Sequence, residues 1–270
     1  MLSYDETGQR VPEGYGHECP VIIVTLRRSA DRRTAIGTQF NSLGLAYTFY
    51  EGVDGRELTK DVLEAVAPRG GIDYCGLLTP AEIGCSLSHL GVIEKIAKDD
   101  APYTAVFEDD VLISADVHAF LQPELLRSLP PFDVLRLSGA EKAPRFTLKV
   151  AELQNHRIIA VPKCRLSMCA LVYSREGATK ILEKINNVTA PIDNMIFHDR
   201  RPFALRVLEI EPPVAYQDTS VASEIGQRLG PADIRSIVRR EFRRARNWLR
   251  LWMSFSYQYG AAGLLRLRRP

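Results

Sequence analysis

Three consecutive carboxylates, Glu108, Asp109 and Asp110, are the clearest candidates for chemistry in this sequence. They directly follow residues 103–107, a hydrophobic run that predicts a buried strand. In open α/β sheets ligands bind beyond the carboxyl ends of the strands, and carboxylate oxygens suit Mg²⁺ or Mn²⁺, which take further ligands from water and phosphates. Because adjacent carboxylates repel one another, the cluster favours a cation between them. A solvated acidic loop is the alternative, and the three residues by themselves leave both interpretations open.

Polar residues also follow two earlier predicted strands, at residues 21–24 and 47–50. After the first strand comes Arg32, whose guanidinium can bind a phosphate or a base, or can simply face solvent on a helix. After the second comes Asp54, next to Gly55, in a turn where the backbone can approach a ligand closely. An Asp is also an ordinary turn residue, so both interpretations stand.

A long helix is predicted to begin at Thr79, because Thr79 is followed by Pro80 and Glu82 in the pattern of a capped helix start. Ser88 and His89 lie on this helix. A lone helical His often satisfies a buried hydrogen bond, so His89 is either structural or functional.

Strands and helices alternate along the chain, which predicts an α/β fold with a mainly parallel central sheet. With 46% hydrophobic and 25% charged residues, the 270-residue chain is typical of a globular protein with one large domain. We expect a flexible leader over residues 1–19, a main domain over 20–229 and a basic tail over 230–270. The predicted strands occupy residues 21–24, 47–50, 103–107, 132–137, 158–161, 168–173 and 203–210, and the predicted helices occupy residues 31–43, 79–98 and 174–186.

The tail differs from the rest of the chain in charge. Residues 230–270 hold ten Arg against Asp233 and Glu241, a net charge of +8, which leaves −6 for the remainder of a chain whose net charge is +2. From Asp233 onward, apolar residues recur every three or four positions beside a row of Arg, as in a helix lying in a membrane interface. We expect residues 232–270 to contact the cytoplasmic membrane surface; a helix packed on the main domain is the alternative. Nucleic-acid binding is not expected, since no recognition motif accompanies the charge.

Five cysteines occur without a C-x-x-C pair, an arrangement typical of reduced thiols in the cytosol, and Cys85 is expected to pack in the core. The polar first residues predict no secretion signal, and no run reaches the ~18–20 apolar residues of a membrane span. The expected location is therefore the cytoplasm, at the inner face of the cytoplasmic membrane of a bacterium.

Four separated motifs occur in one order and together resemble glycosyltransferase family 25, the bacterial lipopolysaccharide and lipooligosaccharide sugar transferases related to animal collagen galactosyltransferases. The resemblance covers about residues 20–223, and its most specific part is Glu82-Ile83-Gly84-Cys85 followed by Ser88-His89. The motifs are Val21-Ile22-Ile23-Val24-Thr25-Leu26 with Asp31-Arg32-Arg33, then Glu51-Gly52-Val53-Asp54-Gly55, then residues 78–89, then Val106-Phe107-Glu108-Asp109-Asp110-Val111.

The resemblance implies a GT-A-like nucleotide-binding fold in which the acidic motif meets a divalent cation, Mn²⁺ or Mg²⁺, and a UDP-sugar donor. It implies Asp110 as the main metal ligand and Glu108 nearer the ribose or the metal-bound waters. Asp109 does either, or supports the turn. The residues that the resemblance implies for donor binding are Leu26, Arg32, Asp54, Gly55, Ser88, His89, Glu108 and Asp109.

Residues 190–194 resemble the Pro-x-Asp segment in the acceptor half of the family. An inverting transferase needs one carboxylate to take the proton of the acceptor hydroxyl, and Asp193 is the residue implied for this role. An N-cap for a helix through Phe197 is the alternative. Asn194 and Gln217 are weaker candidates for contacts with the acceptor.

The function expected from these features is metal-dependent, inverting transfer of galactose or glucose from a UDP-sugar to a lipopolysaccharide or other lipid-linked glycan. A metal-dependent nucleotidyltransferase or phosphohydrolase is the first alternative. It is disfavoured because Thr25-Leu26-Arg27-Arg28, and not a Gly-rich phosphate loop, follows the first strand. A non-catalytic membrane-associated module with the same fold is the second alternative.

Overall fold

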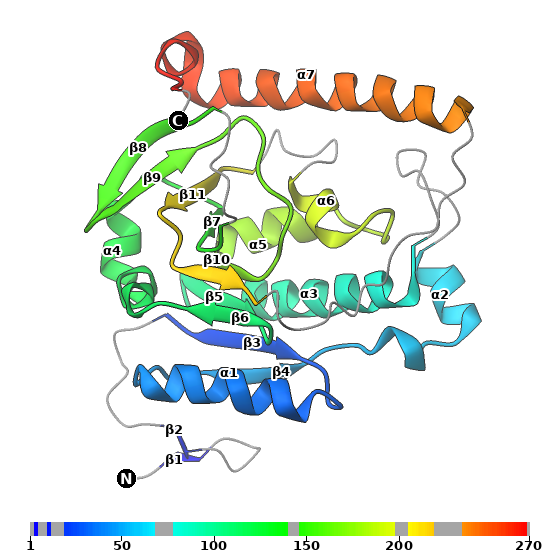
Figure 1. Ribbon diagram of the computed structural model, residues 1–270, viewed down its shortest axis with the longest axis vertical. Coiled ribbons are helices and arrows are strands. Elements are labelled where there is room, and N and C mark those ends of the chain that lie inside the picture. Colours follow the sequence, from blue (N-terminus) through cyan, green and yellow to red (C-terminus); the bar gives the residue numbers. More distant parts are fainter. Residues whose placement is uncertain are drawn as a thin grey trace.

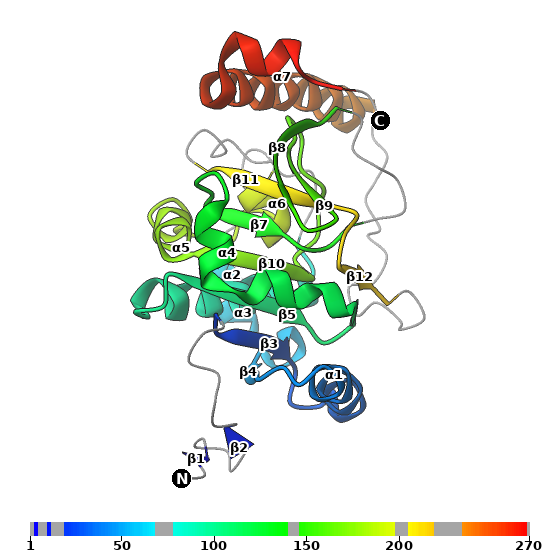
Figure 2. The same ribbon diagram turned by 90° about the vertical axis from the view of Figure 1, so that its left-hand side faces the viewer.

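A computed structural model of the chain describes residues 3–4, 10–11, 19–67, 78–139, 146–197, 205–218 and 234–268. Its centre is an eight-stranded sheet with the strand order β4-β3-β5-β10-β7-β11-β9-β8, and Figure 2 shows β3, β5, β10, β7 and β11 stacked in that order. These strands are β3 (Val21–Thr25), β4 (Thr48–Glu51), β5 (Tyr103–Glu108), β7 (Val134–Arg136), β8 (Leu148–Leu153), β9 (His156–Ala160), β10 (Ala170–Ser174) and β11 (Val207–Glu211).

The expected α/β class and mainly parallel sheet are confirmed. Strands β4, β3, β5, β7, β11 and β8 run in one direction, and only β10 and β9 are reversed. Two short sheets lie outside the main one, with strands β1 (Ser3–Tyr4), β2 (Arg10–Val11), β6 (Val111–Ile113) and β12 (Ala215–Gln217).

Helices cover both faces of the sheet (Figure 1). They are α1 (Ala30–Ser42), α2 (Lys60–Val66), α3 (Pro80–Lys98), α4 (Pro123–Ser128), α5 (Arg175–Leu182), α6 (Ile192–Phe197) and α7 (Ile234–Leu265), with short 3-10 turns η1 (Gly55–Glu57) and η2 (Ala115–Leu121). Alternate residues of β3 point to opposite faces, so Ile23 packs in the hydrophobic cluster that contains α1 and η2, whereas Ile22 packs in the cluster that contains α3, α5 and α6.

The predicted helix starting at Thr79 is confirmed as α3. Thr79 accepts a hydrogen bond from the backbone of Glu82, and Glu82 returns one to the backbone of Thr79, which forms the expected capping box. The helix predicted over residues 174–186 is shorter, since α5 ends at Leu182. Strand β8 was not predicted, because its burial does not alternate along the strand and gives no period-two signal.

Helix α7 packs one side on the sheet domain and leaves the other side exposed. Leu251 and Phe255 are buried, and Gln258 Nε2 donates a hydrogen bond of 2.9 Å to the carbonyl oxygen of Leu205. On the outward side Met253 and Tyr257 are exposed. The expected C-terminal helix is therefore confirmed. One side of it packs on the main domain, as the alternative interpretation supposed, and membrane contact by residues 232–270 stays a prediction.

The predicted domain boundaries at residues 19 and 229 fall at or inside stretches that lie outside the described residues, so they stay predictions. Among the residues that the structure describes, no helix combines the length and apolar character needed to cross a bilayer.

Candidate functional site

A cavity lies at the carboxyl ends of β3, β4 and β5, which run parallel and therefore end at the same edge of the sheet. Its lining brings together all residues predicted to bind the donor or the metal, and one predicted for the acceptor. These are Leu26, Arg32, Asp54, Gly55, Ser88, His89, Glu108, Asp109, Asp110 and Gln217. Asp193 and Asn194 are not part of this lining.

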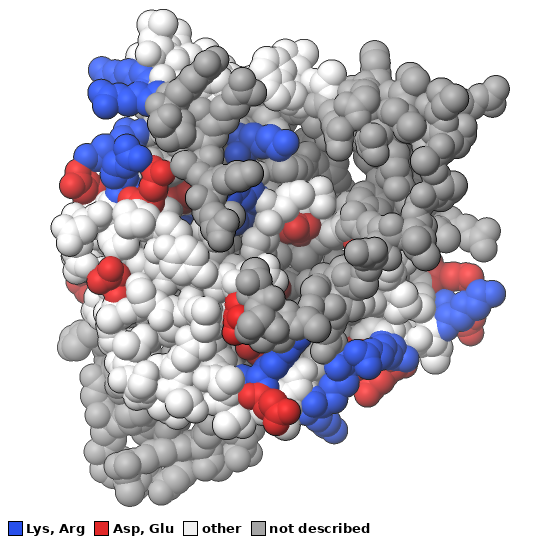
Figure 3. All heavy atoms as spheres, in the orientation of Figure 1, with Lys and Arg blue, Asp and Glu red and all other residues white. Residues whose placement is uncertain are grey.

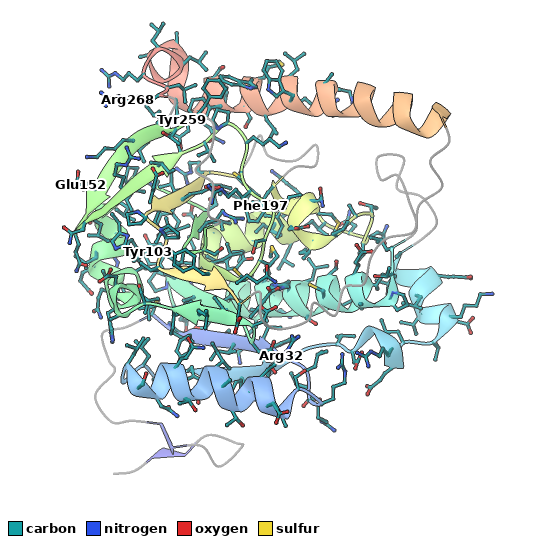
Figure 4. The ribbon with its side chains drawn as sticks, viewed as in Figure 1. Arg32, Tyr103, Glu152, Phe197, Tyr259 and Arg268 are labelled. Carbon is teal, nitrogen blue, oxygen red and sulfur yellow. The ribbon has the colours of Figure 1, made fainter. Side chains whose placement is uncertain are left out.

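Asp109 is engaged by the protein itself. Thr25 Oγ1 donates a hydrogen bond of 2.6 Å to Asp109 Oδ2, and Arg32 Nη1 lies 3.3 Å from Oδ1. Burial raises the pKa of Asp109, while the hydroxyl of Thr25 and the charge of Arg32 act in the opposite direction. The expectation that all three adjacent carboxylates need a cation between them is therefore too simple, since Thr25 and Arg32 compensate part of the cost of burying Asp109. Figure 4 shows Arg32 on α1, close to the end of β3.

Asp110 has a different environment. Gln217 Nε2 donates a hydrogen bond of 3.2 Å to Asp110 Oδ2, whereas Oδ1 is buried and has no hydrogen-bond partner among the described residues. Burial, together with the negative charge of Glu108, raises the pKa of Asp110 to about 6. A buried carboxylate oxygen without a donor is costly, and a bound cation would satisfy it. The residues present thus fit a divalent cation at Asp110.

Glu108 is held by His89 of helix α3. His89 Nε2 lies 2.9 Å from Glu108 Oε1, and the His89 side chain is almost fully buried. The other ring nitrogen, Nδ1, has no hydrogen-bond partner within the described part of the chain. His89 therefore orients the carboxylate of Glu108 and closes one side of the cavity.

The turn after β4 is fixed by its contacts with α3. Ser88 Oγ accepts a hydrogen bond of 2.8 Å from the backbone N–H of Val53 and donates one of 2.7 Å to the carbonyl oxygen of Gly84. A Cβ on Gly55 would lie 1.8 Å from the carbonyl oxygen of Pro80, so Gly55 is required by this close approach. Ser88 and Gly55 line the cavity, but their evident task is to hold the turn.

Asp54 caps η1 through its side chain, which accepts a hydrogen bond of 3.0 Å from the backbone N–H of Arg56 and pairs with Arg28. Burial acts to raise the pKa of Asp54, but the Arg56 backbone bond and the Arg28 guanidinium outweigh it, so the pKa lies below its usual range. Sequence reasoning missed Arg28 and Arg56, although both line the cavity. Their positions in the loops directly after β3 and β4 were the available signal.

Asp193 lies in the first turn of α6 and is half-buried. Its Oδ1 accepts a hydrogen bond of 2.7 Å from the backbone N–H of Asn194. The helix begins at Ile192, so Asp193 is inside the helix and is not the residue before it, as the N-cap alternative requires. Its charge contributes to raising the pKa of the Cys85 thiol, after burial and Glu108, and Cys85 lines the cavity.

A protein-family model described as "Glycosyltransferase family 25 (LPS biosynthesis protein)" matches residues 19–196 of the 270-residue chain. This match spans β3 to α6 and includes the cavity residues except Gln217.

Individual relatives share a modest part of their sequence with this chain. A Haemophilus influenzae protein named "Putative glycosyltransferase" is 22% identical over 204 residues, 73% of this chain and 69% of its own length. The "Lacto-N-neotetraose biosynthesis glycosyltransferase LgtB" of Neisseria gonorrhoeae is 30% identical over 99 residues, 37% of this chain and 35% of its own. A Bos taurus protein named "Probable inactive glycosyltransferase 25 family member 3" is 28% identical over 174 residues, 60% of this chain and 28% of its own.

Proposed function

Because the chain belongs to glycosyltransferase family 25 and is a glycosyltransferase, we propose that it transfers galactose or glucose from a UDP-sugar to a lipopolysaccharide glycan with the help of Mn²⁺ or Mg²⁺. The observation that carries this proposal is Asp110, whose buried Oδ1 has no hydrogen-bond partner among the described residues and lies in a cavity at the ends of three parallel strands. Membership of a glycosyltransferase family argues against the alternative of a nucleotidyltransferase or phosphohydrolase.

The charges of the cavity suit a nucleoside diphosphate. Arg28, Arg32 and Arg56 line it together with Glu108 and Asp110. Guanidinium groups bind phosphate oxygens with charge-assisted hydrogen bonds, and the carboxylates would hold the cation. When bound, the cation neutralises the charge that the departing nucleoside diphosphate gains. Arg32 pairs with Asp109 and Arg28 pairs with Asp54, so both guanidinium groups are already held at the edge of the cavity where the diphosphate would bind.

For the chemical step we propose Asp193 as the general base. The acceptor hydroxyl attacks the anomeric carbon from the face opposite the bond to UDP. Its oxygen forms the new glycosidic bond, its proton passes to the Asp193 carboxylate, and UDP leaves with the bonding electron pair. Asn194 and Gln217 would contact the acceptor. The support is the place of Asp193 on α6, close enough to Cys85 for its charge to act on that cavity residue.

We also propose that α7 holds the enzyme at the inner face of the cytoplasmic membrane, where a lipid-linked acceptor is presented. Leu249, Met253 and Tyr257 lie four residues apart, which places them on one side of the helix, and they are 54%, 56% and 84% exposed. The described face of α7 in Figure 3 shows basic and uncharged side chains, and its segment from residue 245 to 268 contains no Asp or Glu. Apolar side chains flanked by Arg favour an anionic lipid surface.

The enzymatic proposal is tested by measuring UDP release from a panel of UDP-hexoses with Mn²⁺ and a delipidated lipooligosaccharide acceptor. Asp110→Ala should lower kcat/KM by about 10²–10³-fold, the range for loss of one preorganised charge-stabilising group. Glu152→Gln, at the far edge of the sheet on β8 (Figure 4), is the matched control and should leave the rate unchanged. Donor binding without turnover on any acceptor would favour the non-catalytic alternative. The Bos taurus relative is named as probably inactive, which is the reason to test this alternative.

The membrane proposal is tested by co-sedimentation of the full chain with vesicles of neutral lipid alone or with anionic lipid. Replacing Leu249, Met253 and Tyr257 with Gln should reduce partitioning at least ~10-fold, because each buried apolar side chain contributes on the order of 1 kcal/mol or more. Val62→Gln with Leu166→Gln removes exposed apolar side chains elsewhere and serves as the control. Equal binding by the two variants would contradict this role of α7.

A further inference from the structure

One side of the donor cavity brings together a thiol, an imidazole and a carboxylate. Cys85 and His89 lie four residues apart on α3 and therefore project to the same side of the helix. Glu108 ends β5 and faces them, with its Oε1 2.9 Å from His89 Nε2. One possible ligand atom from each of the three residues lies within 4.8 Å of the other two. Over the described residues no other group of three such side chains meets this distance.

This set of atoms has a different chemistry from the Asp110 site. Mn²⁺ and Mg²⁺ prefer carboxylates, waters and phosphate oxygens, whereas a thiolate with an imidazole and one carboxylate is typical of Zn²⁺. Zinc bonds of about 2.0–2.3 Å in a tetrahedron set neighbouring ligand atoms roughly 3.5 Å apart. Side-chain shifts of about an ångström would bring the three atoms to that spacing and would leave a fourth position for water or a phosphate oxygen.

The three side chains, Cys85, His89 and Glu108, border the cavity, although His89 itself is almost fully buried. Of the four cysteines that the structure describes, Cys19, Cys164 and Cys169 are buried and Cys85 alone is partly exposed.

We propose that Cys85, His89 and Glu108 form a binding site for a thiophilic divalent cation such as Zn²⁺, next to the Asp110 site and sharing Glu108 with it. Zinc binding replaces the His89–Glu108 hydrogen bond with bonds to the metal, and the Cys85 thiol releases its proton to solvent as the sulfur–zinc bond forms. No electron transfer occurs. Because Glu108 is shared, Zn²⁺ at this site inhibits sugar transfer. The inhibition rests on the proposed function; the binding does not.

The binding is tested on the full chain with Co²⁺ as a spectroscopic substitute for Zn²⁺. Wild type should gain a thiolate-to-cobalt charge-transfer band at one equivalent of Co²⁺, and an equivalent of Zn²⁺ should abolish it. Cys85→Ser should lack the band, while Cys164→Ser, which removes a buried thiol outside the cavity, should keep it. Absence of the band in wild type, or its persistence in Cys85→Ser, would overturn the proposal.

A second measurement needs no variant. Zn²⁺ should slow alkylation of Cys85 by iodoacetamide at least ~10-fold, as read by peptide mass spectrometry, because a coordinated thiolate is withdrawn from reaction. Equal alkylation with and without Zn²⁺ would also contradict the site. A cobalt–thiolate band without any sugar transfer would leave this site standing and remove the proposed function. Cation-dependent transfer that Zn²⁺ does not inhibit would remove the sharing of Glu108.

Discussion

Two neighbouring groups of residues in the cavity each contain an Asp, and the two Asp residues have different roles. The supporting group consists of Thr25, Arg32, Asp109 and the turn 52–57, and its polar atoms bond to one another or to α3. The ligand group consists of Glu108, Asp110 and His89, where two buried polar atoms lack hydrogen-bond partners among the described residues. Adjacent Asp residues therefore differ: Asp109 stabilises the fold, and Asp110 is left with an oxygen for a ligand.

The largest effect on stability should come from the supporting group. In Gly55→Ala the new Cβ meets the backbone carbonyl of Pro80 at 1.8 Å, which no side-chain rotation relieves. We expect a loss of about 3 kcal/mol or more in the free energy of unfolding, measured by urea denaturation. Gly91→Ala is the control: its Cβ would meet the hydroxyl end of Tyr50, a flexible side chain, so the loss should be clearly smaller. Equal losses would show that the turn is not held against α3 as described.

Breaking the Asp109 contacts should have the next largest effect. Asp109→Ala removes the carboxylate that accepts a hydrogen bond from Thr25 Oγ1 and pairs with Arg32. We expect a loss of about 2 kcal/mol in the free energy of unfolding, since a largely buried pair loses one member. A double-mutant cycle with Arg32→Gln, followed by urea denaturation, should give a coupling energy of about 1 kcal/mol. Additive losses would show that Arg32 does not compensate Asp109.

In the cation-free protein, Asp110→Asn should increase the free energy of unfolding, whereas the two substitutions above decrease it. The pKa of Asp110 is raised from 3.8 to about 6 by burial and by Glu108, so the folded state binds the proton more tightly than the unfolded chain. The stability of wild type therefore falls as pH rises from about 4 to about 6, and the cost persists above that window. At pH 8 Asp110→Asn should be more stable than wild type by about 1–3 kcal/mol, and at pH 4 the two should be equal. If the Asp110→Asn variant were less stable than wild type at pH 8, the claim that the buried charge of Asp110 destabilises the cation-free protein would be wrong.

The elements that build the cavity could be predicted from the sequence because their signals are local. The run Val21–Thr25, the capping box at Thr79 and the strand before Glu108 each depend on residues close in sequence. The contacts that distinguish Asp109 from Asp110 could not be predicted from local patterns, since Thr25 lies 84 residues from Asp109 and Gln217 lies 107 residues from Asp110. The three acids by themselves therefore suggested one shared cation, and the family resemblance, which implied Asp110 as the main ligand, left the role of Asp109 open. The pairing of β9 with β11 is likewise between segments far apart in the sequence, with no local signal.

The most direct test of the account is a thermal shift with UDP and Mn²⁺ on wild type, Asp110→Asn and Asp109→Asn. Ligand at about 100 times its Kd stabilises a folded protein by about 2.7 kcal/mol. For a domain of this size, that free energy raises Tm by several degrees. Wild type should show this shift with Mn²⁺ and lose it with EDTA. Asp109→Asn should unfold at a lower Tm yet keep the shift, whereas Asp110→Asn should show none. A full shift in Asp110→Asn, or a shift in wild type that EDTA leaves intact, would contradict the claim that Asp110 holds the cation that binds the donor.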